Sequence, residues 1–343
     1  MSYPTTPDAL TTDWLSDALG QPVTDFSIER FGEGVGVVGQ VVRLHLTGTA
    51  APATIIAKFP SPAPENRAVA ATYDMYGREV RFYQSLADSV GVRAPACYFA
   101  AHDPATEDFV LLLEDLAGYR LGDQVAGASV EDARRVVDAI ARLHGETWED
   151  TERLGLRSHN NPAQRDGMIA GFDLGWPVVL ERFGELVPAN ARSAGTRMGR
   201  STAGLLEEMC RGPVCLSHAD VRLDNLFFGD DEVLFVDWQS ICSSAPEMDL
   251  AYFLTQSLTP AVRRSEDFCA RYFEALRAHV PSYDRSEFER RYRVSALYLL
   301  NYAVVIAGTL DLGNERGVAL AQALIERSMT ALDELDAFAL LSS

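Results

Sequence analysis

The sequence has few cysteines, no basic leader and no long apolar run. Its five cysteines are odd in number and include no C-x-x-C pair, which indicates neither a disulfide framework nor a zinc site. The first residues, MSYPTTPDAL, lack the basic and apolar segments of a signal peptide. These absences predict a reducing, cytoplasmic setting.

The most apolar stretch, 294–310, spans only 17 residues and contains Ser295 and Asn301. A helix that crosses a membrane needs about 20 consecutive, mostly apolar residues. We therefore expect a buried helix here and no membrane partner.

Basic charge is also scarce, because 30 Lys and Arg stand against 49 Asp and Glu, for a net charge of −19. Binding nucleic acid requires clustered cationic side chains, so no nucleic-acid partner is expected. The acidic balance permits a cationic small substrate, although a solvated acidic surface explains it equally well. With 343 residues and 47% hydrophobic content, the chain can build one large or two modest globular domains.

Three glycines follow a G-x-G-x-x-G pattern in FGEGVGVVGQVVRLHL: Gly34, Gly36 and Gly39. A dinucleotide-binding turn with this pattern must open a helix. Here the glycines precede an alternating apolar pattern, which indicates a strand, and a second strand-like run, TIIAKF, carries Lys58. We expect a glycine loop between two strands, and a nicotinamide-dependent oxidoreductase is the disfavoured alternative.

Strands are expected for most of the first hundred or so residues, after a short helix closed by Gly20. A helical period over 66–86 interrupts them, and FVLLL at 109–113 reads as a buried strand. Helices dominate beyond this strand, beginning with one that Ser129 caps.

A change in composition near residue 114 divides the chain into two lobes. Residues 1–113 form a small β-rich lobe, and residues 114–343 form a larger, mainly helical one. The exception in the second lobe is a predicted hairpin at 226–236, whose turn is rich in Gly and Asp.

The strongest chemical signal, LSHADVRLDNLFFGDDEVLFVDWQS, surrounds this hairpin. Asp220 and Asn225 precede it in an H-x-D-x-x-x-x-N motif, and Asp237 follows it. Because a hairpin returns the chain to its starting point, we expect these three side chains to converge. Two carboxylates and an amide oxygen suit Mg²⁺, and phosphoryl transfer needs such a set. Each residue taken alone is explained as well by turn formation, but the whole set is not.

These motifs resemble the aminoglycoside phosphotransferase and choline kinase family, from about Phe31 to about Leu254. The segments LLLEDL, HADVRLDNLFF and VDWQ look closest to ecdysteroid-kinase-like and related bacterial phosphotransferases. The resemblance implies a two-lobed, protein-kinase-like α+β fold. It also implies a kinase that uses ATP and Mg²⁺ to phosphorylate a hydroxyl of a small-molecule acceptor, such as an aminoglycoside-like, choline-like or steroid-like alcohol.

By this resemblance, Asp220 matches the catalytic base, and Asn225 and Asp237 match the metal ligands. Lys58 matches the lysine that contacts the nucleotide phosphates, and Glu79 matches its ion-pair partner on a helix.

The resemblance also places Gly34, Gly36 and Gly39 at the phosphates and Glu114, with Asp115, at the hinge beside adenine. At that hinge, backbone groups usually make the contacts.

Other matches are looser. The family commonly has H-G-D where this chain has Ala219 before Asp220. Arg222 stands where protein kinases have a catalytic-loop lysine, and both phosphate binding and a surface role are open for it. We expect structural roles for three other residues: His144, His218 and Asp249.

Three aromatic residues of the helical lobe fit either an acceptor pocket or the core: Trp148, Trp176 and Tyr252. A catalytically silent pseudokinase or a nucleotide-binding scaffold is the alternative function. A scaffold has no physical need for Lys58, Glu79 and the three residues at the hairpin together, which speaks against it.

Overall fold

The computed structural model describes residues 3–31, 38–309 and 313–341. The chain forms two compact units. The first comprises Met1–Ser89, Arg93–Arg120 and Leu234–Ser240, and the second comprises Val90–Val92, Leu121–Val233 and Ile241–Ser343. The first unit thus extends past residue 113 and takes in a distant segment, because Trp238 in that segment stacks on Phe82.

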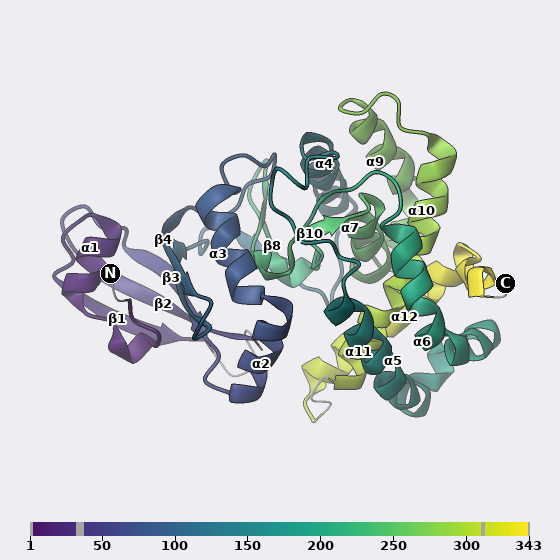
Figure 1. The fold of residues 1–343 in the computed structure, drawn as a ribbon, viewed down its shortest axis with the longest axis horizontal. Coiled ribbons are helices and arrows are strands. Elements are labelled where there is room, and N and C mark those ends of the chain that lie inside the picture. The colour runs from purple at the N-terminus through teal and green to yellow at the C-terminus, as the bar shows by residue number, and fades with distance from the viewer. Residues whose placement is uncertain (1–2, 32–37, 310–312, 342–343) are drawn as a thin grey trace. The chain divides into compact units, whose positions relative to one another are not determined.

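An antiparallel five-stranded sheet in the order β1-β2-β3-β5-β4 forms the centre of the first unit (Figure 1). Its strands are β1 (Asp25–Arg30), β2 (Gly39–Thr47), β3 (Thr54–Pro60), β4 (Cys97–Asp103) and β5 (Asp108–Glu114). Gly39 begins a strand rather than a helix. Together with the antiparallel pairing, this excludes the dinucleotide-binding alternative, which requires parallel strands and a helix at the glycines.

Alternation along β3 separates two sides of the sheet. Ala57 and Phe59 are fully buried in a core cluster that also contains Leu15 of α1 (Thr12–Leu19). Since successive side chains of a strand point to opposite faces, Lys58 lies on the other face. The helix α1 ends at Gly20 in the left-handed conformation, as expected, and Thr11 caps its start.

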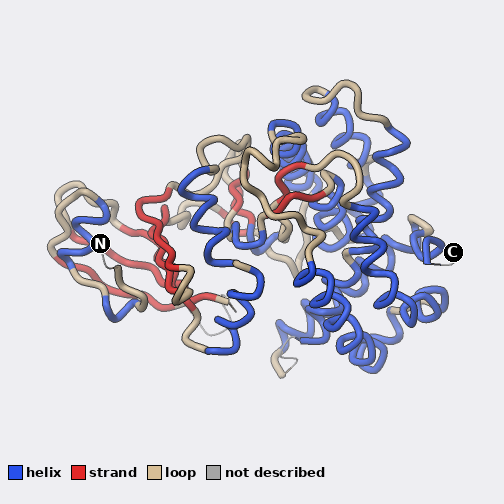
Figure 2. The backbone as a smooth tube through the Cα atoms, viewed as in Figure 1, coloured by secondary structure: helices blue, strands red, loops and turns tan. Residues whose placement is uncertain are grey.

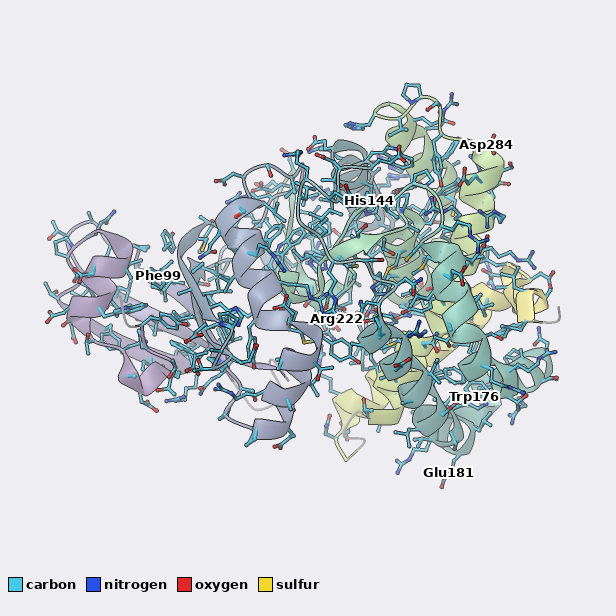
Figure 3. The ribbon with its side chains drawn as sticks, in the orientation of Figure 1. Phe99, His144, Trp176, Glu181, Arg222 and Asp284 are labelled. Carbon is cyan, nitrogen blue, oxygen red and sulfur yellow. The ribbon has the colours of Figure 1, made fainter. Side chains whose placement is uncertain are left out.

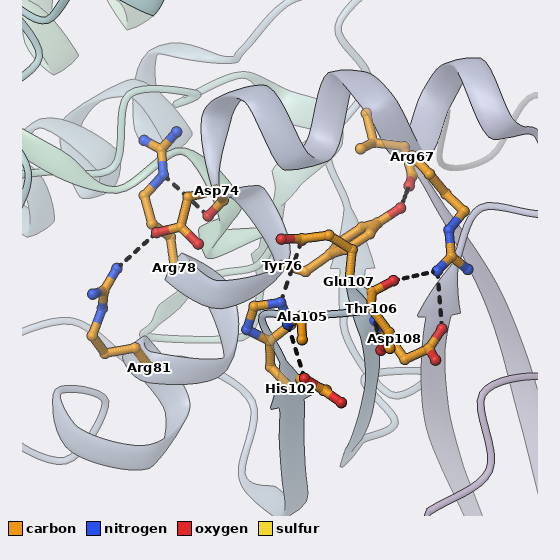
Figure 4. Close-up of polar contacts among 12 residues, drawn as sticks. Arg67, Asp74, Tyr76, Arg78, Arg81, His102, Ala105, Thr106, Glu107 and Asp108 are labelled. Atoms are coloured by element: carbon orange, nitrogen blue, oxygen red, sulfur yellow. Dashed lines mark hydrogen bonds and ion pairs between the residues drawn. The ribbon is translucent and has the colours of Figure 1, made fainter.

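Two helices, α2 (Pro64–Tyr73) and α3 (Met75–Ser85), replace the single helix expected at 66–86. The chain breaks at Asp74, whose φ of 53° is left-handed, a conformation that Asp tolerates better than most residues. The Asp74 carboxylate accepts a hydrogen bond from Arg81, two turns into α3 (Figure 4). The segment therefore forms two separate helices rather than one continuous helix.

Helices form most of the second unit (Figure 2). They are α4 (Val130–Glu146), α5 (Pro162–Phe183), α6 (Ala189–Met209), α7 (Glu247–Tyr252), α8 (Pro260–Ser265), α9 (Phe268–Arg277), α10 (Arg285–Tyr298), α11 (Leu300–Thr309) and α12 (Glu315–Glu334). The expected cap of α4 is confirmed, because Ser129 Oγ accepts a hydrogen bond from Asp132 N at 3.0 Å.

The apolar stretch that begins at 294 is buried, as predicted, but it forms the end of α10 and all of α11 rather than one helix. The buried amide of Asn301 donates to Tyr298 O at 2.7 Å and accepts from Thr202 Oγ1 at 3.0 Å. These bonds satisfy its polar atoms inside the core. Among the described residues, no helix is both long enough and apolar enough to span a membrane.

Four short strands lie around the predicted catalytic segment: β7 (Cys215–Ser217), β8 (Leu226–Phe228), β9 (Val233–Phe235) and β10 (Cys242–Ser244). The strands β7 and β10 pair antiparallel. Between β8 and β9, Gly229 N donates to Glu232 O at 2.9 Å and closes the turn. The predicted strand–turn–strand pattern is therefore confirmed.

Candidate active site

One cluster of charged side chains lies in the first unit. Lys58 Nζ on β3 lies 2.6 and 2.8 Å from the two carboxylate oxygens of Glu79 on α3, and 2.9 Å from Asp237 Oδ1. The Glu79 side chain is only 1% exposed, whereas that of Asp237 is 21% exposed. The predicted lysine–glutamate pair is present, and Asp237 joins it.

The two carboxylates keep the Lys58 ammonium charged. Burial alone would lower the pKa of Lys58, but the attraction of Asp237 and Glu79 outweighs it and raises this pKa above its ordinary value. Burial raises the pKa of Glu79, and the neighbouring ammonium opposes that rise. A charged, nearly buried ammonium is suited to bind phosphate oxygens.

The segment that carries Asp237 is held against α3. Trp238 Nε1 donates to Phe235 O at 2.9 Å, and its ring stacks on Phe82 with centroids 3.8 Å apart. Asp237 itself has a φ of 67°, and Gln239 Nε2 donates to its Oδ2 at 3.2 Å. Left-handed backbone at a residue other than glycine costs free energy and is frequent at functional sites.

The side chain of Glu114, at the end of β5, is engaged within the first unit. Its carboxylate accepts hydrogen bonds from Arg93 at 3.1 Å and from Ala96 N at 3.0 Å. Burial would raise the pKa of the adjacent Asp115, but Arg43 at 2.7 Å lowers it below its ordinary value. With both carboxylates engaged in this way, a role for Glu114 at adenine falls to its backbone groups and stays a prediction.

A second cluster, in the second unit, surrounds Asp220. Asp220 Oδ1 accepts from the Tyr252 hydroxyl at 2.9 Å, and Oδ2 accepts from Asn225 Nδ2 at 2.9 Å. Arg222, which Figure 3 labels on the loop between β7 and β8, has its Nε 3.6 Å from Asp220 Oδ2. Neutral donors therefore hold both carboxylate oxygens in place, with one guanidinium nearby.

Buried Asp249 on α7 shapes the backbone just before Asp220. It accepts hydrogen bonds from His218 N at 2.7 Å and Ala219 N at 2.9 Å. Ala219 has a φ of 63°, which is left-handed and accounts for a glycine at the same place in the H-G-D motif. The structural role expected for Asp249 is confirmed, since it holds this loop.

His144, labelled in Figure 3, completes the support beneath the loop. It is fully buried, with Nε2 3.2 Å from Asp249 and Nδ1 2.7 Å from the Tyr272 hydroxyl. Burial would raise the pKa of Asp249, but the hydrogen bond and charge of His144 lower it overall. The structural role expected for His144 is confirmed.

The oxygen donors of the two clusters fit the chemistry of Mg²⁺. Asn225 directs its Nδ2 to both the backbone oxygen and the carboxylate of Asp220, so its Oδ1 is the atom left for a ligand. Asp237 supplies a partly exposed carboxylate. Among the described residues, no group of three or more His, Cys, Asp or Glu forms a metal site by itself. That Asp237 and Asn225 bind Mg²⁺ stays a prediction.

The predicted site residues thus fall into two groups. Lys58, Glu79 and Asp237 are in contact in the first unit, and Asp220, Asn225 and Arg222 are gathered in the second. Gly39 begins β2, where a Cβ would lie 3.1 Å from Phe59 O, so that glycine allows a close approach of two strands. Gly34 and Gly36 lie outside the described residues.

Two features escaped the sequence interpretation. The first is the hydroxyl of Tyr252, which reaches Asp220 from a helix more than thirty positions later. A signal existed, because Tyr252 follows Asp249 by three residues and therefore lies on the same side of α7. The second is that Lys58 is the only lysine in the chain, since every other residue in the combined count of Lys and Arg is arginine.

Comparison with known proteins identifies the family. The model of the phosphotransferase enzyme family (APH) matches residues 36–288, which include both clusters. The chain belongs to this family. It is a phosphotransferase, and the resemblance inferred from the motifs is confirmed at this level.

Solved structures show the fold of this phosphotransferase. A candidate aminoglycoside phosphotransferase from Ralstonia eutropha JMP134 is 14% identical, with a TM-score of 0.60 over 94% of this chain and 97% of that one. The GDP and kanamycin complex of APH(2'')-IIIa is 15% identical, with a TM-score of 0.51 over 95% and 99%. Choline kinase from Cryptosporidium parvum Iowa II is 10% identical, with a TM-score of 0.52 over 92% and 89%.

At these identities the likeness establishes the fold alone, and it confirms the predicted protein-kinase-like α+β fold. Curated protein sequences give no significant match to the phosphotransferase.

Proposed function

We propose that this phosphotransferase transfers the γ-phosphate of ATP to a hydroxyl group of a small molecule. The observation that carries the proposal is the carboxylate of Asp220, which accepts a hydrogen bond on each oxygen and is 18% exposed. A carboxylate held in one orientation can align a hydroxyl for attack and accept its proton.

The remaining groups act on the nucleotide. Lys58 binds phosphate oxygens with an ammonium that Glu79 holds in place. Asp237 and Asn225 would hold Mg²⁺, which when bound neutralises charge on the phosphates. Arg222 adds a guanidinium close to Asp220, where it can bind the transferred phosphate. Most of the catalysis then comes from positioning and electrostatics.

The names of similar structures indicate which acceptors to propose. These include complexes of aminoglycoside phosphotransferases with kanamycin and gentamicin, and choline and ethanolamine kinases. On this ground we propose an aminoglycoside-like or choline-like alcohol as the acceptor, and on the resemblance of the segments LLLEDL, HADVRLDNLFF and VDWQ a steroid-like alcohol.

A thermal-shift titration with ATP and with GTP, each with and without MgCl₂, tests the nucleotide part. A ligand that binds only the native state at a hundredfold excess over Kd stabilises it by about 2.7 kcal/mol. We expect a metal-dependent shift in the wild type that Asp237→Asn loses. Asp231→Asn, an exposed change in the β8–β9 turn, is the matched control and should keep the shift.

The absence of any shift in the wild type would instead support the catalytically silent alternative. If the shift is present, release of ADP in the presence of kanamycin, choline, ethanolamine or a sterol then tests the transfer and sorts the acceptor classes.

A further inference from the structure

Tyr76 on α3 joins the ends of two strands of the first unit. Its hydroxyl donates to Val38 O at 2.5 Å and accepts from Ser61 N at 3.1 Å. Its ring is 1% exposed and stacks on Phe109 of β5, with centroids 4.2 Å apart. A buried tyrosine hydroxyl with two backbone partners fixes the position of both segments relative to the helix.

These two segments flank the paired ends of β2 and β3. Val38 directly precedes Gly39, Ser61 directly follows Pro60, and Gly39 pairs with Pro60 in the antiparallel ladder. The close approach described above, between Gly39 and Phe59 O, lies at this same end. The hydroxyl of Tyr76 therefore holds together the end of the β2–β3 ladder at Gly39, one of the predicted phosphate-binding residues.

The same helix also holds the lysine. Glu79 lies three residues after Tyr76, so both side chains extend from one side of α3. Glu79 binds Lys58, which lies two residues before Pro60 on β3. Thus α3 makes two polar contacts with this part of the chain. Glu79 binds Lys58 on β3, and Tyr76 binds Ser61 just after β3.

The start of α3 is itself tied down by polar contacts (Figure 4). Asp74 accepts from Arg81, and Arg67 of α2 donates to Thr106 O and Asp108 Oδ1, both at 2.9 Å. The latter bonds connect the preceding helix to the beginning of β5. Contacts with the sheet thus lie on both sides of the break at Asp74, from Arg67 before it and from Tyr76 and Glu79 after it.

We propose that Tyr76 is a positioning residue for the nucleotide phosphates. It keeps the backbone at Val38 and Gly39 at a fixed separation from the ammonium of Lys58, so that both act on one phosphate chain. The inference rests on the proposed nucleotide site. It adds a residue that touches neither nucleotide nor metal.

The test compares Tyr76→Phe with Tyr83→Phe in the full chain. Tyr83 lies on the same helix, and its buried hydroxyl has no hydrogen-bond partner among the described residues, so its removal is a matched control. Isothermal titration calorimetry gives Kd for ADP with Mg²⁺ and for adenosine, which lacks phosphates. We expect Tyr76→Phe to weaken ADP binding about tenfold and to leave adenosine binding within about twofold, whereas Tyr83→Phe changes neither, tenfold being about 1.4 kcal/mol.

Equal weakening of ADP and adenosine would overturn the proposal, because it would indicate general loosening of the unit. Unchanged ADP binding in Tyr76→Phe would also overturn it. A wild type that binds no ADP would overturn the proposed function itself, which separates the two failures. Should Tyr76→Phe not fold, Gly39→Ala disturbs the same end of the ladder and must show the same loss confined to ADP.

Discussion

The two clusters of the candidate site hold their carboxylates by different means. In the first, Asp237 and Glu79 are paired directly with the ammonium of Lys58. In the second, Asp220 is held mainly by the neutral donors of Asn225 and Tyr252. A direct ion pair fixes charge for binding anionic phosphates, whereas neutral hydrogen-bond donors fix the orientation of an acid. The difference is consistent with the roles proposed above, phosphate binding for the first cluster and proton transfer for the second.

Removing the charge of Asp220 separates these two roles most strongly. We expect Asp220→Asn to lower the turnover number about 10³-fold, since an amide cannot accept the proton of the attacking hydroxyl. The Kd for nucleotide should stay near the wild-type value, because the lysine cluster is intact. Steady-state kinetics and calorimetry measure the two quantities, with Asp231→Asn as control, and near-normal turnover would refute the role of Asp220.

Breaking the support of the second cluster affects stability as well as rate. We expect Asp249→Asn to lower the free energy of unfolding by about 3 kcal/mol at pH 7, because two backbone N–H groups and His144 lose a charged partner. Asp138→Asn, which removes a half-exposed ion pair with Arg271, should cost less than about 1 kcal/mol. Urea unfolding monitored by fluorescence measures both.

The pH dependence of this effect has a defined sign. The folded-state pKa of Asp249 lies below the ordinary 3.8, so its ionised form stabilises the protein at all pH values above about 3.8. The stabilisation disappears only as the pH falls through the lower, folded-state pKa. A difference between wild type and Asp249→Asn that vanished already at pH 6 would contradict the assignment.

The hydrogen bond from the Tyr252 hydroxyl to Asp220 can be tested by itself. We expect Tyr252→Phe to lower turnover about tenfold, in line with the loss of one hydrogen bond to a charged group. The nucleotide Kd should not change. Tyr302→Phe is the control. Its ring packs edge-on against that of Tyr252, with centroids 5.7 Å apart, and its hydroxyl accepts a hydrogen bond from Gln164. Equal effects of the two variants would mean that packing, not the bond to Asp220, matters.

The smallest effect is expected at the left-handed residue before Asp220. In Ala219→Gly, relief of backbone strain is offset by loss of a buried methyl group and by a more flexible unfolded chain, so stability should change by less than about 1 kcal/mol. Ala219→Val should destabilise by about 2 kcal/mol, since a β-branched residue rarely adopts this conformation. Thermal unfolding distinguishes the two, and equal losses would argue against strain.

Local patterns in the sequence predict the features that depend on near neighbours. The strand with Lys58, the cap at Ser129 and the turn between β8 and β9 all follow from periodicity and turn chemistry. The two helix breaks, at Asp74 and Leu299, do not, because each interrupts a continuous helical pattern. Intrinsic propensity decides such cases only weakly when tertiary contacts compete with it.

Side-chain partners distant in the sequence were predictable only through the family resemblance. The contact of Lys58 with Asp237 spans 179 positions, and no spacing rule could reveal it. Tyr252 lies outside the motif that carries the resemblance, and its helical spacing from Asp249 does not reveal that its hydroxyl bonds Asp220. Such contacts arise from how the elements pack, which a single sequence does not show.

The solitary lysine of the chain makes the site observable in isolation. With nitrogen-15 supplied only in lysine, the side-chain ammonium region of a nuclear magnetic resonance spectrum should contain one signal, that of Lys58. Apart from the α-amino group, an amine-selective reagent likewise has one target, and it lies beside Glu79 and Asp237. A chain with 29 arginines and one lysine thus carries a built-in reporter of whatever binds beside Glu79 and Asp237, with no probe to be engineered.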